Sequence, residues 1–163
     1  MTSNNIQVKE NFLSDVEYNK VLEHLNNSEW TIQVSNRGDE PSKGFLMSRV
    51  NPNKFFYEDL VSKVKNSFGI SGNIQEIYFN GQWFGRDGQF HTDGSDKTVL
   101  IYISEWRPDW GGFTHLYDNG SHIIFVPIKN NAVCFPGNIL HKSYAFSEQF
   151  CPMRVTLALK FSK

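Results

Sequence analysis

Apolar residues recur every three to four positions in two early segments of the chain, and this spacing predicts two amphipathic helices. The first segment spans residues 12–30, where Ser14 has the side chain of a helix N-cap and acidic residues follow it. The second spans residues 53–70, with a stop signal near its end at Gly69. Its apolar positions lie four residues apart, at Phe56, Leu60, Val64 and Phe68.

After residue 73 the pattern changes to short segments rich in Val, Ile, Phe and Tyr, which Gly, Asn and Pro separate. This punctuation is typical of a sheet-built sandwich or barrel, and it predicts about seven or eight strands. The segments are 73–84, 88–93, 97–104, 111–118, 121–128, 132–136 and 153–161. Because amphipathic helices need an apolar surface to cover, we expect an α+β, mainly β fold. It would be a jelly-roll-like sandwich with the N-terminal helices packed on one sheet.

Composition narrows the class of protein. The 163 residues suit one domain over 1–163, with a helical part at about 10–70 and a β-core at about 74–162. A net charge of -1 makes nucleic acid an unlikely partner, and no apolar run reaches the length of a membrane span. The first residues lack the apolar core of a signal peptide, so we expect a cytoplasmic protein. Cys134 is expected to be a buried, reduced thiol, and the sequence gives no indication of the oligomeric state.

The stretch FHTDG, residues 90–94, contains a candidate metal-binding pair. Alternate side chains of a strand share one face, so His91 and Asp93 would point the same way, and Gly94 would let the chain leave the strand. His141, which follows a Pro-Gly turn, is a candidate third ligand. Two His and one carboxylate form the ligand set of non-haem Fe(II) oxygenases. On these residues alone a polar turn and a structural His141 remain open, and the chain's other three His are not assigned to metal.

The last segment, residues 153–161, separates an apolar face from a polar one. Its even-numbered positions place Arg154 and Thr156 inside the sandwich, where a guanidinium without an anion is costly. A carboxylate ligand held through the guanidinium fork would offset this cost. An internal salt bridge is the alternative. Tyr102 is placed by the same alternation to offer its phenol to that carboxylate, or else to a backbone group.

The order of these elements resembles a known family. The chain carries HxD at His91 and Asp93, then Tyr102, a Trp-Gly-Gly turn at 110–112, Phe-Pro-Gly before His141, and RxT from Arg154. This order is similar to that of the Fe(II)/2-oxoglutarate-dependent dioxygenases, in particular the small bacterial and phage-type members of the prolyl 4-hydroxylase-like branch. The resemblance covers about residues 75–161 and implies a double-stranded β-helix core.

The resemblance also implies roles for single residues. His91, Asp93 and His141 would be the catalytic Fe(II) ligands. Arg154 would hold the distal carboxylate of 2-oxoglutarate with help from Tyr102 and Thr156. Gln82, which stands where the family usually has Tyr, would reach this co-substrate by a hydrogen bond. The remaining cofactors are O2 and, as a possible addition, ascorbate.

The implied reaction is hydroxylation of a C–H bond with release of succinate and CO2. The substrate class that the family favours is a peptidyl proline, in a protein or peptide. Lys160 stands where several peptidyl-proline hydroxylases carry Trp. This difference weakens the assignment of a proline substrate more than it weakens the assignment of the cofactors. Alternatives are a free amino acid or other small molecule, a Zn-dependent hydrolase, and an inactive binding module.

Two further expectations concern access to this site. The polar, Gly-bounded loop at residues 37–44 has the chemistry of a lid. Arg86, Trp83, Trp106 and Trp110 are candidates for lining an entrance, or are ordinary surface and core residues.

Overall fold

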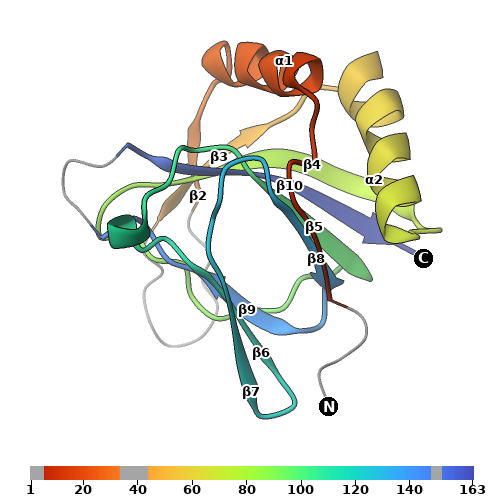
Figure 1. The fold of residues 1–163 in the computed structure, drawn as a ribbon. Coiled ribbons are helices and arrows are strands. Elements are labelled where there is room, and N and C mark those ends of the chain that lie inside the picture. Colours follow the sequence, from red (N-terminus) through yellow and green to blue (C-terminus); the bar gives the residue numbers. More distant parts are fainter. Residues whose placement is uncertain (1–5, 34–43, 148–151) are drawn as a thin grey trace.

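The chain folds into two antiparallel sheets that face each other, with two helices on the outside of the larger sheet (Figure 1). The computed structural model describes residues 6–33, 44–147 and 152–163. The larger sheet has the strand order β1-β8-β5-β10-β4-β3-β2. Its strands are β1 (Gln7–Lys9), β2 (Thr31–Gln33), β3 (Phe45–Arg49), β4 (Asn73–Gln82), β5 (Lys97–Tyr102), β8 (Ala132–Pro136) and β10 (Arg154–Ser162).

The smaller sheet has the strand order β7-β6-β9. It consists of β6 (Thr114–Asp118), β7 (Ser121–Phe125) and β9 (Leu140–Ser143), and a 3-10 turn, η2 (Pro108–Trp110), precedes it. The chain passes from the larger sheet to the smaller one and back, because β6, β7 and β9 alternate in sequence with β5, β8 and β10. The expected sandwich is therefore confirmed, with a helical layer on one sheet only.

The two helices form where their apolar spacing predicts them, over shorter spans. Helix α1 covers Asp15–Asn26, and Ser14 closes a capping box with Glu17 at its start. The second helix begins with a π-helical turn, η1 (Phe55–Leu60), and continues as α2 (Val61–Phe68). Gly69 ends it in the left-handed region at a φ of 66°. Both expected end signals are thus observed, although the ends lie a few residues inside the predicted segments.

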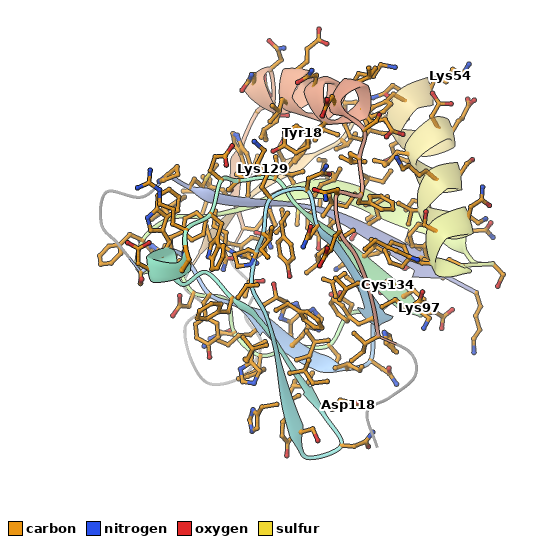
Figure 2. The ribbon with its side chains drawn as sticks, in the orientation of Figure 1. Tyr18, Lys54, Lys97, Asp118, Lys129 and Cys134 are labelled. Atoms are coloured by element: carbon orange, nitrogen blue, oxygen red, sulfur yellow. The ribbon has the colours of Figure 1, made fainter. Side chains whose placement is uncertain are left out.

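Each face of strand β10 belongs to a different hydrophobic layer. Its odd-numbered residues pack with the four apolar residues of the second helical segment, all of which are buried. Tyr18 of α1 reaches the same layer and donates a hydrogen bond to the backbone oxygen of Ile103 (Figure 2). The even-numbered side, including Ala158, faces the smaller sheet and contacts the cluster of Tyr78, Leu100 and Phe135. The alternation predicted for this strand is confirmed, and it directs Arg154 and Thr156 into the space between the sheets.

The expected strand at residues 88–93 was wrong. His91 forms only an isolated bridge with His141, and its neighbours have no regular structure. A Gly-rich, polar segment gains too little from side-chain packing to extend a ladder. Gly94 is not in the left-handed region, and a Cβ there would meet nothing within 4 Å, so the chain does not require glycine at this turn.

The structure also contains strands that the sequence pattern did not predict, namely β1, β2, β3 and β9. Strands β1 and β2 have three residues each and lie at the two edges of the larger sheet. Such short edge strands carry too few positions to show an alternation. In the described ranges no helix combines the length and the apolar character needed to cross a membrane.

Candidate metal centre

The backbone brings His91, Asp93 and His141 together from two separate segments. His91 and His141 exchange two backbone hydrogen bonds, with N···O distances of 2.9 and 2.8 Å. The amide of Asp93 donates to the carbonyl oxygen of Gly137 at 2.7 Å. The HxD segment is therefore fixed against the turn that precedes His141, although it forms no regular strand.

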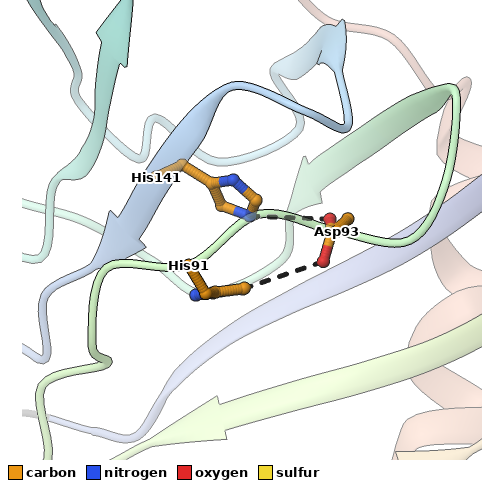
Figure 3. Close-up of side chains that lie close together, drawn as sticks. All are labelled: His91, Asp93 and His141. Carbon is orange, nitrogen blue, oxygen red and sulfur yellow. Dashed lines mark ion pairs between the residues drawn. The ribbon is translucent and has the colours of Figure 1, made fainter. Parts of the chain in front are cut away.

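These three residues are the one group of three or more His, Cys, Asp or Glu in the described chain whose ligand atoms converge closely enough for a metal ion. The ligand atoms all lie within 4.8 Å of one another. Asp93 lies beside both imidazoles, with Oδ1 3.7 Å from Nε2 of His91 and Oδ2 3.5 Å from Nε2 of His141 (Figure 3). A single small cation at the centre of this group would contact all three side chains.

Both imidazoles are held with the same nitrogen toward this centre. Nδ1 of His91 lies 2.8 Å from the carbonyl oxygen of Gln89, and Nδ1 of His141 lies 2.8 Å from that of Ile139. A carbonyl oxygen only accepts, so each Nδ1 carries the proton of the neutral ring. Each Nε2 then has a free lone pair. This is the arrangement that second-shell carbonyl groups give to metal-binding histidines.

The protonation states also suit a cation. Burial lowers the pKa of His141 to about 4, so its ring is neutral at pH 7. Burial raises the pKa of Asp93, but His141, Lys160 and a hydrogen bond from Thr98 lower it more, and its net pKa lies below the ordinary value. The centre thus presents the neutral imidazole of His141 and the carboxylate of Asp93, with Nε2 of His91 beside them. The residues fit a divalent metal of the Fe(II) or Zn(II) kind by donor type and by convergence.

Asp93 has two further side-chain partners that the sequence did not indicate. Oγ1 of Thr98 donates to Oδ2 at 2.6 Å, and Nζ of Lys160 lies 2.9 Å from Oδ1. Lys160 also contacts Tyr78, and its pKa is raised: burial lowers it, but Tyr78 and Asp93 raise it more. The alternation along 153–161 already placed Lys160 on the inner face, which was the available signal.

Arg154 is a fully buried cation with 1% of its surface exposed. Nε donates to the carbonyl oxygen of Gly112 at 2.7 Å, Nη1 to Oε1 of Gln82 at 3.0 Å, and Nη2 to Oγ1 of Thr114 at 2.9 Å. None of these partners is charged, and Arg154 makes no salt bridge to any described carboxylate. Burial lowers its pKa to about 10, which still leaves it charged at pH 7. The internal salt bridge considered for this residue is therefore absent from the described part of the chain.

The other residues expected at the co-substrate site surround this guanidinium to different degrees. Tyr102 is buried and donates to Oγ1 of Thr114 at 3.0 Å, so Thr114 links it to Arg154. Nε2 of Gln82 is held by the carbonyl oxygens of Arg86 and Ser143 while its Oε1 accepts from Arg154. Thr156 is buried beside them on β10. Thr114 was missed, although it directly follows the Trp-Gly-Gly-Phe turn.

A pocket of about 250 Å³ lies beside His91 and Asp93 and reaches Gln82, which accepts a hydrogen bond from Arg154. It is lined by Gln82, His91, Asp93 and Lys160 together with the inner faces of β3 and β4. The Oδ1 atom of Asn80, on that lining, is buried and has no hydrogen-bond partner among the described residues. The expected entrance residues Arg86, Trp83, Trp106 and Trp110 do not line this pocket. The expected lid at 37–44 falls outside the described residues except for Gly44.

The remaining histidines lie elsewhere. His24 of α1 packs against Phe56 and Phe79, so it is partly buried rather than a free surface residue. Nε2 of His115 lies 2.7 Å from Nδ1 of His122 across the β6–β7 pair. None of these three histidines belongs to the converging group, which agrees with leaving them out of the metal site.

Comparison with known proteins gives structural likeness and no sequence-level match. No protein-family model matches the sequence, and no curated protein matches it significantly. A prolyl-4-hydroxylase from Pseudomonas putida superposes with a TM-score of 0.72 at 14% identity, over 99% of this chain and 94% of that one. A 2OG-Fe(II) oxygenase family oxidoreductase from Burkholderia pseudomallei superposes with a TM-score of 0.77 at 12% identity, over 98% and 86%.

A third solved structure holds a peptide. It is a Trichoplax adhaerens prolyl hydroxylase in complex with a fragment of the hypoxia inducible factor oxygen degradation domain. Its TM-score is 0.74 at 18% identity, over 98% of this chain and 84% of that one. These likenesses define the fold of this chain. It is the double-stranded β-helix of the 2-oxoglutarate oxygenases, as the resemblance implied.

Proposed function

We propose that this protein is an Fe(II)- and 2-oxoglutarate-dependent dioxygenase that hydroxylates a C–H bond. His91, Asp93 and His141 hold the metal, and Arg154 binds the distal carboxylate of 2-oxoglutarate with Thr156, Tyr102 and Gln82 around it. When bound, Fe(II) and 2-oxoglutarate supply, with O2, the oxidation of the substrate, and the co-substrate leaves as succinate and CO2. The shared fold agrees with this assignment, but a fold alone does not imply a function, so the residues of the site carry the proposal.

The observation that carries the proposal is the guanidinium of Arg154, fully buried without an anion, beside the pocket of the converging ligands. An uncompensated buried charge costs several kcal/mol, of the order of 3–5 kcal/mol when one partner of a buried pair is missing. A dicarboxylate that reached Arg154 at one end and the metal ligands at the other would offset this cost. A Zn-dependent hydrolase would use the same three ligands but would leave Arg154 without a role.

The residues of this chain contribute position and environment to the reaction. The carbonyl groups of Gln89 and Ile139 fix the ring orientation of the two His ligands. Gln82 and Thr114 hold the guanidinium in place, so it needs little reorganisation to accept a carboxylate. Burial of Asp93 and His141 keeps bulk water away from the metal side of the pocket.

For the substrate, the peptidyl proline that the family favours stays our first candidate. Support comes from the structural neighbours described above, two of which are prolyl hydroxylases, and one of these is in complex with a peptide. A free amino acid or another small molecule is the second candidate. The specific observation that favours it is Lys160, whose charged head lies in the pocket beside Asp93.

The test is an anaerobic titration with Fe(II) and 2-oxoglutarate, without any substrate. Chelation of the metal by the 2-oxo acid should produce a visible charge-transfer band. The band should be lost in His91→Ala, Asp93→Ala and His141→Ala, and it should require much more 2-oxoglutarate in Arg154→Met. His122→Ala is the matched control, because it removes a histidine that lies outside the converging group.

Steady turnover supplies the second measurement. Succinate should accumulate with Fe(II), 2-oxoglutarate, O2 and added ascorbate in the wild type and in His122→Ala. Succinate release that survives Asp93→Ala, or a preference for Zn(II) with no band, would contradict the proposal.

A further inference from the structure

Lys160 places a cation in the lining of the pocket that has no assigned role toward the metal or 2-oxoglutarate. Lys160 extends from β10 with its side chain 17% exposed, and Nζ lies 2.9 Å from Oδ1 of Asp93. In the register of the larger sheet Lys160 is paired with Glu76 of β4, two positions beyond the Ala158–Tyr78 pair. Tyr78 lies beneath its ammonium group, with Nζ 5.4 Å from the ring centre, and restrains it inside the pocket.

The charges along the pocket show why this ammonium group needs another partner. With the proposed ligands bound, there are two positive charges on the metal ion and one on Arg154. The single negative charge of Asp93 and the two of 2-oxoglutarate balance them. The other two charged residues of the lining, Arg49 and Glu76, pair with each other at 2.9 Å. Lys160 would then share its one anionic partner, Asp93, with the metal and would be the surplus cation of the lining, and a poorly exposed cation is costly unless a further anion approaches it.

A polar atom on the same sheet face as Lys160 lacks a hydrogen-bond partner among the described residues. Oδ1 of Asn80 is buried, accepts no hydrogen bond from any described residue and lines the same pocket. Asn80 pairs with Thr156 and Lys160 pairs with Glu76, so Asn80 and Lys160 point to the same side of the sheet with Tyr78 between them. The pocket therefore offers one site for an anion and one acceptor for an N–H donor.

We infer that Lys160 is a specificity-determining residue that binds a carboxylate of the substrate, and that Asn80 accepts an N–H group of the same molecule. The substrate class is an amino-acid unit with a free carboxylate, either a free amino acid or the C-terminal residue of a peptide. This inference rests on the proposed function, since it places the carboxylate beside the metal ligands. It restricts the peptidyl candidate to residues that carry a free carboxylate near the oxidised carbon.

The experiment measures binding near the metal without turnover. The protein is loaded with Mn(II) and 2-oxoglutarate under nitrogen, and paramagnetic relaxation of added molecules is followed by proton NMR. The probes are a mixture of the L-amino acids, the matching amino-acid amides, and the N-acetylglycyl derivatives of both. The acids and amides test the carboxylate, and the free and N-acetylglycyl forms separate a free amino acid from a peptide terminus.

Members of one acid series should relax strongly in the wild type, and their amides should not. Lys160→Met should weaken binding of those acids about 10- to 100-fold, the range for loss of a hydrogen bond to a charged group. Lys160→Arg should restore part of this loss because it keeps the charge. Arg49→Met removes the other pocket cation, which Glu76 already neutralises, and should change the binding little.

Three results would overturn the inference. The first is that, with the wild-type protein, the acids and the amides relax equally strongly or that neither of them relaxes. The second is acid binding unchanged in Lys160→Met. The third is a loss of Mn(II) or 2-oxoglutarate affinity in Lys160→Met as large as the loss of acid binding, because Lys160 would then serve only Asp93 or the co-substrate. The charge-transfer titration uses no substrate, so its failure would reject the oxygenase assignment itself and is separate from these outcomes.

Discussion

The hydroxyl group of Thr98 is bonded to the carboxylate of Asp93, with Oγ1 2.6 Å from Oδ2. Thr98 is the second residue of β5 and is 1% exposed, so the sheet fixes this donor in place. The carboxylate is thereby oriented from the larger sheet, while its backbone is tied to Gly137. Asp93 lies outside any regular strand, so these two contacts replace the ladder that would otherwise hold a ligand residue.

We expect Thr98→Val to weaken metal binding without changing the fold. Valine keeps the shape of threonine but removes the donor, and loss of an outer-shell partner typically costs about 10- to 100-fold in metal affinity. Calorimetric titration with Fe(II) under nitrogen or with Mn(II) measures this change. Thr31→Val, on an exposed edge strand, is the control. An unchanged metal affinity in Thr98→Val would show that the carboxylate does not need this donor.

Arg154→Met should act on 2-oxoglutarate rather than on the metal. The side chain is long enough to fill the same space, but it loses the charge that we assign to the distal carboxylate. Hydrogen bonds to charged groups contribute about 1.5–3 kcal/mol each, so affinity for 2-oxoglutarate should fall at least about 10-fold. The charge-transfer titration measures it, and the affinity for Fe(II) alone should stay close to that of the wild type. A parallel loss of both affinities would mean that Arg154 supports the whole site structurally.

Gly137→Ala and Gly94→Ala form a matched pair, because both glycines adjoin Asp93: its amide donates to the carbonyl oxygen of Gly137, and Gly94 follows it in the chain. A Cβ at Gly137 would lie 2.2 Å from the backbone oxygen of Ser95, whereas a Cβ at Gly94 would meet nothing within 4 Å. We expect Gly137→Ala to destabilise the protein by about 1–3 kcal/mol, as overpacking does, and to weaken metal binding through Asp93. Gly94→Ala should be neutral or slightly stabilising. Urea denaturation and metal titration of both variants check the pair, and a destabilised Gly94→Ala would contradict the open space at that turn.

Ser14→Ala should lower the stability of the helical layer. Ser14 caps α1, and its backbone amide and hydroxyl both bond to Glu17. Removing an N-cap side chain typically costs about 1 kcal/mol. Ser62→Ala is the comparison, because Ser62 is exposed within α2 and alanine has the higher helix propensity there. The midpoint of urea denaturation should therefore fall in Ser14→Ala and rise in Ser62→Ala.

Cys134 should be unreactive in the folded protein, although it is a free thiol in an apolar strand. Cys134 lies on β8 (Figure 2). It is 0% exposed, and burial raises the pKa of its thiol from 9.0 to about 11. In a Cys151→Ser background, a thiol reagent at pH 8 should label it only upon unfolding.

The same pKa shift predicts a pH effect on stability. The raised pKa of Cys134 favours the folded state fully below pH 9, and this contribution is lost as the pH rises from 9 to about 11. The free energy of unfolding of Cys134→Ala should lack that part of the alkaline decline, and an identical decline would exclude the thiol as its source.

Much of the fold could be predicted from the sequence because the relevant signals are local. The four-residue spacing from Phe56 to Phe68 needs only one helix to be recognised, and the cap at Ser14 and the stop at Gly69 are local as well. The alternation along β10 likewise assigned one face to the helices and the other to the interior. The short edge strands carried no such signal, since three residues are too few to show a period.

For the candidate site, the sequence by itself determined which residue types are present and in what order: His91 and Asp93 two apart, His141 after a turn, and Arg154 facing inward. Only the tertiary structure decided their partners. Thr98 contacts Asp93 from only five positions away. Thr114 against Arg154 and Lys160 against Asp93 are contacts between residues 40 and 67 positions apart. Such pairs depend on strand order and register, which are set by packing between segments distant in the chain, and no local pattern encodes them.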